Sequence, residues 1–191
     1  MAGINRALIS GYDRIIYENK VIQNNSKVCV FISHKSSDMD AAEAVARYLM
    51  QNNIDVYLDK KDADLQKKTK EKDAQGIVDS IEKALKCSTH ILVLVSDQTK
   101  ESWWVPYEVG YSKKGKKKIA SALLVGYVDD FPDYLKIEET IKSPDEFKTY
   151  AQKLKRLDAP YGTLFENAGQ NVSNPSELES YIRRPAMKSQ P

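Results

Sequence analysis

Residues 102–112 bring together the side chains of this chain that are best suited to chemistry. Both tryptophans, Trp103 and Trp104, stand there with Pro106 and Glu108 in a segment that is typical of a short helix. Pro106 suits the first helical turn, where a missing N–H group is not needed for a hydrogen bond. Glu108 would then lie near the positive end of the helix dipole. A carboxylate beside aromatic rings suits a sugar that develops positive charge.

The remaining pattern predicts an α/β fold that supports this stretch. Two continuous apolar runs, 28–32 and 90–95, are typical of parallel strands that are covered on both faces. Shorter runs predict a second strand at 54–58, nearer an edge of the sheet, and further strands at 119–125 and 137–141. Apolar residues at helical spacing predict helices around 42–49 and 77–85, at 102–112, and after a capping box with proline at 143–146.

Strands that alternate with helices predict a mostly parallel sheet with helices on both faces. In a flavodoxin-like order of 2-1-3-4-5, ligands bind beyond the carboxyl ends of the first and third strands. The segments that follow these strands here are 33–38 and 96–108. The topology therefore predicts that the tryptophan–glutamate segment and the first polar loop meet at one crevice.

Length and composition indicate one domain of ordinary size, at 191 residues and a net charge of +2. We expect a domain at 27–157 with a helical N-terminal extension at 1–26 and a partly irregular C-terminal extension at 158–191, which includes a short helix from 174. Apolar spacing predicts a helix over about 5–18, which either packs on the domain or contacts another subunit. Two cysteines in apolar settings and the lack of a secretion signal favour a reducing cytoplasm.

Several functions find no support in the sequence. No apolar run reaches the roughly 20 residues that a membrane-spanning helix needs. Two histidines and two cysteines show no metal-ligand spacing. The near-balanced charge argues against nucleic acid as a partner, and the lysines at 113–118 are typical of a solvated turn. No glycine-rich phosphate loop is present, so a dinucleotide would not be held in Rossmann fashion.

Several of these features, taken in order along the chain, resemble a bacterial TIR domain over about residues 27–157. The features are the run Val30-Phe31-Ile32-Ser33-His34, the acidic Asp38, a long polar connection after Asp59, Gly76 before a helix, and Ser102 ahead of Trp104-Val105-Pro106-Tyr107-Glu108. The resemblance implies a flavodoxin-like three-layer fold with a five-stranded sheet. In many bacterial and plant members it also implies cleavage of NAD⁺ between nicotinamide and ribose.

Some bacterial members cyclise the ADP-ribose product into a signal, and in Thoeris anti-phage systems this signal activates a separate effector. A small chain such as this one is similar to the Thoeris sensor component. The resemblance implies NAD⁺ as substrate without a further cofactor, TIR–TIR self-association, and an effector reached through the small molecule. The lysine-rich connection after the second strand departs from many relatives, because it lacks their usual Gly and Pro.

Glu108 matches the catalytic glutamate of the family, whose carboxylate would stabilise the oxocarbenium-like ribose. The alternative is a solvated helix glutamate. The resemblance also places four residues on the nicotinamide–ribose side: Phe31, Ser33, His34 and Lys35. For His34 the alternative is a loop histidine without chemistry, and backbone groups near Ser33 are better candidates for ligand contacts.

The remaining candidates for NAD⁺ binding are Asp59, Ser96, Trp103 and Trp104. Asp59 begins the polar connection and would approach adenosine or phosphate, while Ser96 either reaches the crevice or caps a turn. Trp104 is expected to fix the helix against the sheet, and Trp103 is the more exposed of the pair. Asp38 is expected to cap the helix that follows it.

Three functions follow from this pattern. The leading one is an NAD⁺-cleaving enzyme that makes a cyclic or otherwise modified ADP-ribose. The second is a non-enzymatic TIR adaptor, against which the pair of Trp104 and Glu108 argues. The third is a nucleoside deoxyribosyltransferase, which shares the sheet type and a catalytic carboxylate.

Overall fold

The structure is a computed structural model that describes residues 2–8, 28–58, 73–126, 131–157 and 172–182. Its centre is a five-stranded sheet in the order β2-β1-β3-β4-β5. The strands are β1 (Cys29–Ser33), β2 (Asp55–Tyr57), β3 (His90–Val95), β4 (Lys118–Leu123) and β5 (Glu139–Ile141). All four neighbouring pairs are parallel. The predicted strand order is confirmed, with β2 at an edge.

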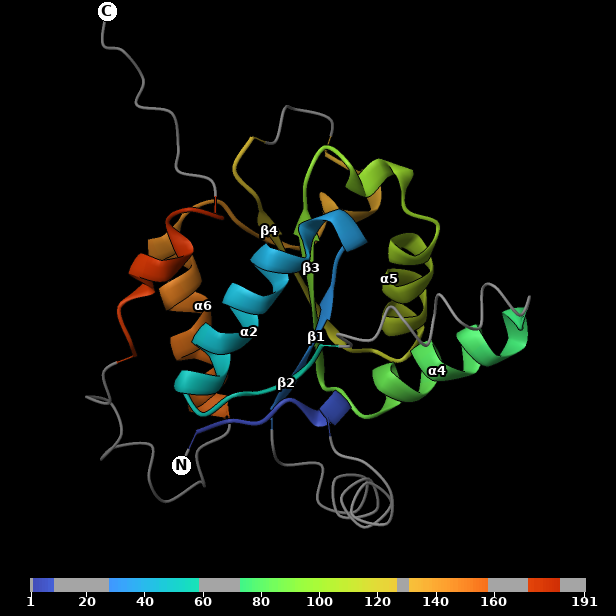
Figure 1. Cartoon of the computed structure of the whole chain (residues 1–191), viewed down its shortest axis with the longest axis horizontal. Helices are drawn as coiled ribbons and strands as arrows, with labels where there is room; N and C mark the ends of the chain where they lie inside the picture. Colours follow the sequence, from blue (N-terminus) through green and yellow to red (C-terminus); the bar gives the residue numbers. More distant parts are fainter. Residues whose placement is uncertain (1, 9–27, 59–72, 127–130, 158–171, 183–191) are drawn as a thin grey trace, which may run out of the picture.

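Helices cover both faces of the sheet (Figure 1). One layer holds α2 (Met39–Gln51) and α6 (Pro144–Leu157), and the other holds α4 (Ala74–Lys86) and α5 (Trp104–Lys114). Because side chains alternate across a strand, β1 serves both layers. Val30 and Ile32 pack in the α2–α6 cluster, whereas Cys29 and Phe31 pack in the α4–α5 cluster. The three layers confirm the flavodoxin-like α/β fold.

Three predicted strands are shorter than the sequence suggested: β2 covers 55–57 of the predicted 54–58, and β4 and β5 are shortened as well. β4 ends at Leu123 because Leu124 forms an antiparallel bridge with Ile182, and the Val125 N–H donates to the Tyr181 carbonyl at 2.8 Å. β5 begins only at Glu139, since a 3₁₀ turn, η4 (Asp133–Leu135), precedes it. Pairing with the C-terminal segment limits β4, and a local turn occupies the residues before β5.

The predicted capping box starts α6. The Glu146 N–H donates to Ser143 Oγ at 3.2 Å, and the Glu146 carboxylate accepts the Lys142 N–H at 2.6 Å. Pro144 occupies the first helical position. These contacts satisfy N–H groups that a helix start otherwise leaves unpaired.

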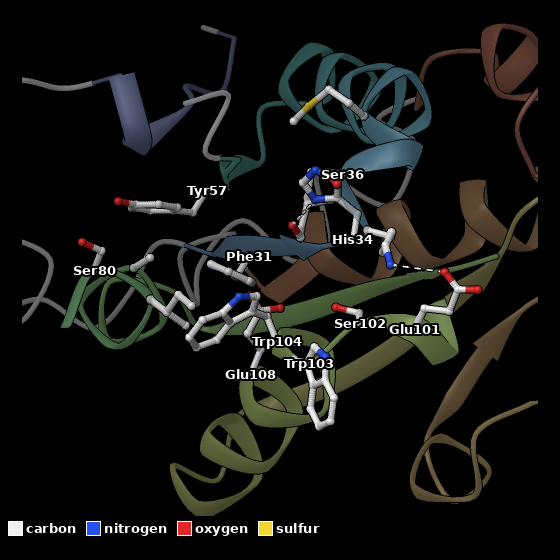
Figure 2. Close-up of a pocket in the computed structure, with 15 residues that line it drawn as sticks. Phe31, His34, Ser36, Tyr57, Ser80, Glu101, Ser102, Trp103, Trp104 and Glu108 are labelled. Atoms are coloured by element: carbon white, nitrogen blue, oxygen red, sulfur yellow. Dashed lines mark hydrogen bonds and ion pairs between the residues drawn. The ribbon is translucent and has the colours of Figure 1, made fainter. Parts of the chain in front are cut away.

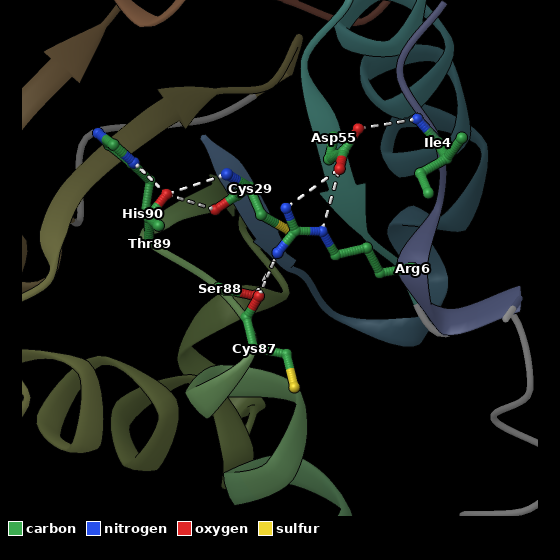
Figure 3. Close-up of polar contacts among 8 residues, drawn as sticks. All are labelled: Ile4, Arg6, Cys29, Asp55, Cys87, Ser88, Thr89 and His90. Atoms are coloured by element: carbon green, nitrogen blue, oxygen red, sulfur yellow. Dashed lines mark hydrogen bonds and ion pairs between the residues drawn. The ribbon is translucent and has the colours of Figure 1, made fainter. Parts of the chain in front are cut away.

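The N-terminal residues pair with the edge of the sheet instead of starting a helix. Asn5 bridges Val56 in parallel, and a 3₁₀ turn, η1 (Arg6–Leu8), follows. Arg6 is 3% exposed and forms an ion pair of 3.1 Å with Asp55, which is fully buried (Figure 3). Its guanidinium also donates to the Cys87 carbonyl at 2.7 Å. The start of the predicted 5–18 helix is therefore wrong, and residues 9–18 lie outside the described residues.

The C-terminal segment 172–182 packs across α2 and α6. It contains the 3₁₀ helix η6 (Pro175–Leu178), where the sequence predicts a short helix. The Ser173 N–H donates to Asn52 Oδ1 at 2.8 Å, and the Tyr48 hydroxyl donates to the Ser173 carbonyl at 2.9 Å. In the described ranges, no helix combines the length and apolar character that crossing a bilayer requires.

Candidate active site

A pocket of about 270 Å³ opens beyond the carboxyl end of β1, on the side of the sheet that α4 and α5 cover (Figure 2). Its walls come from β1, β2, α4, the segment after β1 with the first residue of α2, and the start of α5 with the residues just before it. The lining residues are Phe31, Ile32, His34, Lys35, Ser36, Met39, Tyr57, Ser80, Ile81, Ala84, Glu101, Ser102, Trp103, Trp104 and Glu108. The first polar loop and the tryptophan–glutamate segment therefore meet at one pocket, as the topology predicts.

The start of α5 positions the carboxylate. A 3₁₀ turn, η3 (Thr99–Glu101), leads into the helix, and the Val105 N–H donates to Ser102 Oγ at 3.3 Å. Pro106 lies in the first turn of α5, as predicted. Its missing N–H costs no hydrogen bond within the helix at this position. Glu108 follows on the buried face of the second turn. It is therefore no solvated helix glutamate.

Burial controls the protonation of Glu108. The residue is 8% exposed, and burial raises the pKa of its carboxyl to about 7. The Ser33 hydroxyl opposes this effect, since it donates to Glu108 Oε2 at 2.5 Å and lowers the pKa. No cation pairs with this carboxylate among the described residues. A cationic ligand would therefore meet a carboxylate with no competing protein charge.

Aromatic rings form one apolar wall of the pocket. Phe31 and Tyr57 stack with ring centres 6.0 Å apart, and Trp104 meets Tyr107 edge-to-face at 6.1 Å. Trp104 is 38% exposed, whereas Trp103 is 91% exposed and points away from the other labelled side chains (Figure 2). The sequence suggests that both tryptophans flank the carboxylate. In the structure Trp104 and Phe31 form this apolar wall, and Trp103 stands at the rim.

The segment after β1 brings three polar side chains to the pocket: His34, Lys35 and Ser36. His34 Nδ1 lies 3.1 Å from the Ile32 carbonyl, so this ring nitrogen faces the backbone of its own loop. Lys35 forms an ion pair of 3.7 Å with Glu101, across the pocket mouth. His34 and Lys35 line the pocket, and their contact with NAD⁺ stays a prediction. The Lys35–Glu101 pair links the loop to the segment before α5.

The other sequence candidates have different positions. Ser33 contacts Glu108 and does not itself line the pocket. Ser96 also lies outside the lining: its hydroxyl donates to Asp38 Oδ2 at 2.7 Å and accepts the Gln98 N–H at 3.2 Å. Asp38 stands at the N-terminus of α2 but makes no side-chain capping bond, so the predicted cap is replaced by a link between two loops. Asp59 lies outside the described residues.

Sequence reasoning missed the contribution of α4 and β2 to the pocket. Ser80, Ile81 and Ala84 line it from α4, and Tyr57 lines it from the end of β2. The signal that could have found them is the strand order, because the helix that follows β2 must cross back over β1. Helical periodicity identifies the buried face of α4, but it does not say which turn reaches the end of the sheet.

The arrangement can bind a cation against a carboxylate and a flat ring against aromatic side chains. In the part of the chain that the structure describes, no group of three or more His, Cys, Asp or Glu residues is arranged to hold a metal ion. Two carboxylates line the pocket, and Glu101 pairs with Lys35. Glu108, which touches the pocket from a buried position, can stabilise a developing positive charge. This combination suits cleavage of a glycosidic bond to a charged leaving group.

Comparison with protein families gives a match over most of the sheet and its helices. A model of the TIR domain matches residues 30–157, from the second residue of β1 to the end of α6. The matched range contains every residue that lines the pocket. Comparison with curated proteins gives no match. Since the matched range covers well over half of the sequence, the chain belongs to the TIR domain family.

Proposed function

We propose that this TIR domain cleaves NAD⁺ between nicotinamide and ribose, with Glu108 as the catalytic carboxylate. The observation that carries the proposal is the position of Glu108: buried, unpaired with a cation among the described residues, and in contact with an aromatic pocket. An adaptor gains nothing from a buried carboxylate of this kind, because burial without a cation is unfavourable.

The proposed reaction uses the charge of the substrate. The pyridinium ring of NAD⁺ brings a positive charge near Glu108 and favours its ionised form. As the bond between ribose C1′ and the pyridinium nitrogen breaks, its electron pair moves to that nitrogen and nicotinamide leaves neutral. The positive charge passes to the ribose, where the Glu108 carboxylate stabilises it. The apolar walls around Phe31 and Trp104 strengthen this interaction, since they exclude water.

The ribosyl cation then takes a nucleophile. Attack by water gives ADP-ribose and a proton, and attack by a group within the same molecule gives a cyclic product. The resemblance to the Thoeris sensor supports a cyclic ADP-ribose signal that acts on a separate effector in anti-phage defence. TIR–TIR self-association would complete the side of the site that holds the adenosine half.

The test is to incubate the protein with NAD⁺ and, separately, with deoxynucleosides, and to identify products by mass spectrometry. We expect nicotinamide release, and a loss of roughly 100-fold or more in Glu108→Gln, because one electrostatic group in a transition state contributes that much. Glu177→Gln is the matched control, since this glutamate lies in η6, outside the pocket. Base exchange on deoxynucleosides would indicate a deoxyribosyltransferase, and no product from assembled protein would indicate an adaptor.

A further inference from the structure

We infer that Ser33 is a positioning residue for Glu108: its hydroxyl holds one carboxylate oxygen and leaves the other for the ligand. The inference rests on the proposed function, because it gives Ser33 a part in the reaction of that site. It also changes the sequence-based assignment, in which Ser33 lines the nicotinamide–ribose side.

The geometry of β1 directs Ser33 toward α5. Ser33 is the last residue of the strand, and its side chain lies on the same face as that of Phe31, two residues earlier. Phe31 reaches the pocket, whereas Ser33 is 1% exposed and lies behind the carboxylate. The 2.5 Å contact from Ser33 Oγ to Glu108 Oε2 therefore joins the sheet to the helix in a buried position.

Ser33 is the hydrogen-bond donor that fixes the carboxylate. In the described part of the chain, no other side chain or backbone N–H donates to the Glu108 carboxylate, and no cation pairs with it. A serine hydroxyl has one proton, so its donation to Oε2 leaves no proton to donate to substrate. The contact also fixes the carboxylate plane, so that Oε1 is the oxygen left for a cationic ligand.

The same hydrogen bond favours the ionised carboxylate, which is the form that the reaction needs. A hydrogen bond to a charged group shifts the balance between the two protonation states by about one to two pH units. Without Ser33, burial would still raise the pKa of Glu108, and no hydrogen bond from Ser33 would lower it. A smaller fraction of the Glu108 carboxyl groups would then be ionised near neutral pH. Ser33 thus fixes the orientation of the Glu108 carboxylate and favours its ionised form.

The experiment compares Ser33→Ala with Ser33→Thr, which keeps the hydroxyl, and with Ser121→Ala as a control. Ser121 is also a fully buried strand serine, but it contacts β5 and not Glu108. The first readout is the pKa of Glu108 in ligand-free protein, from the ¹³C NMR signal of its carboxyl carbon, identified by its absence in Glu108→Gln. The second is the pH profile of kcat/KM for NAD⁺ cleavage.

We expect Ser33→Ala to raise the pKa of Glu108 by about one to two units and to move the acid limb of kcat/KM by the same amount. Activity at pH 6 should fall about 10- to 100-fold and recover to within a few-fold at pH 9.5, because a shift of one unit changes the ionised fraction tenfold. Ser33→Thr should return both values toward those of the original protein, and Ser121→Ala should change neither.

An unchanged Glu108 pKa in folded Ser33→Ala would overturn the inference, as would a loss of activity that is equal at all pH values. Ser33→Cys, nearly isosteric with a weak donor, gives the same test if the alanine variant does not fold. The proposed function fails separately, if Glu108→Gln still cleaves NAD⁺, whereas the NMR titration without NAD⁺ tests the Ser33–Glu108 contact by itself.

Discussion

Glu108→Gln should stabilise the fold at pH 8 while it removes activity. Burial raises the pKa of Glu108 from 4.5 to about 7, so the folded protein holds this proton more tightly than the unfolded chain. The contribution of the bound proton to stability is complete below pH 4.5 and is lost as the pH rises through 7. At 1.36 kcal/mol per pH unit, the ionised carboxylate costs the fold about 3 kcal/mol at pH 8, as an upper bound.

The glutamine side chain of the Glu108→Gln variant cannot ionise, and its oxygen can still accept the Ser33 hydroxyl. The difference in unfolding free energy between the two proteins should therefore change between pH 5 and pH 8. The change should be about 3 kcal/mol and should favour the variant at pH 8. That difference corresponds to roughly 6–12 °C in Tm for a chain of this size. A fixed offset from the buried amide group is present at both pH values and cancels in the comparison.

The assay is urea unfolding of both proteins at pH 5, 6, 7 and 8, without NAD⁺. Glu101→Gln is the control, because its side chain lies at the mouth of the same pocket but is 59% exposed. An offset between Glu108→Gln and the original protein that stays constant from pH 5 to 8 would refute the reasoning. It would mean that the carboxylate is hydrated in solution.

Three further predictions concern the N-terminal segment, the pocket rim and self-association. Arg6→Met should cost about 3–5 kcal/mol in urea unfolding, because it leaves the buried Asp55 without its cation, and a cost below about 1 kcal/mol would contradict this. Trp103→Ala should change the unfolding free energy by no more than about 0.5 kcal/mol, because the ring is 91% exposed, yet raise KM for NAD⁺; an unchanged KM would remove Trp103 from the site. Specific activity should rise with protein concentration from nanomolar to high micromolar, measured beside light scattering, and a flat response in monomeric protein would mean that one chain holds the whole site.

Much of the fold could be predicted because apolar patterning encodes it directly. The runs at 28–32 and 90–95 are buried in the sheet, and alternation with helices limits the topologies to a few. Parallel strands end at the same edge, so the order 2-1-3 brings Phe31 and Glu108 to one pocket. The contacts of serine and aspartate side chains could not be predicted, since patterning does not specify which hydroxyl donates to which carboxylate. The sequence suggests that Ser96 and Asp38 are turn or cap residues. The folded structure instead places Ser96 Oγ 2.7 Å from Asp38 Oδ2.

The N-terminal residues show a second limit of patterning. Ile4 and Leu8 stand at helical spacing, but both are exposed, at 38% and 62%. Arg6, which the pattern would place on a polar face, is instead buried against Asp55. A charged pair contributes nothing to an apolar periodicity, so such an anchor cannot be detected from spacing.

The pairing of residues 3–6 with the edge of the sheet has a consequence for where this domain begins. The Val56 N–H donates to the Ile4 carbonyl at 2.9 Å, and the Gly3 N–H donates to the Met50 carbonyl at 2.7 Å, so the outer side of β2 is partly covered. A protein trimmed to the family match at 30–157 would present β2 as an open edge, which can recruit strands from other molecules. It would also remove Arg6, the cation that pairs with Asp55. This chain thus covers part of its sheet edge with residues that lie outside the family match.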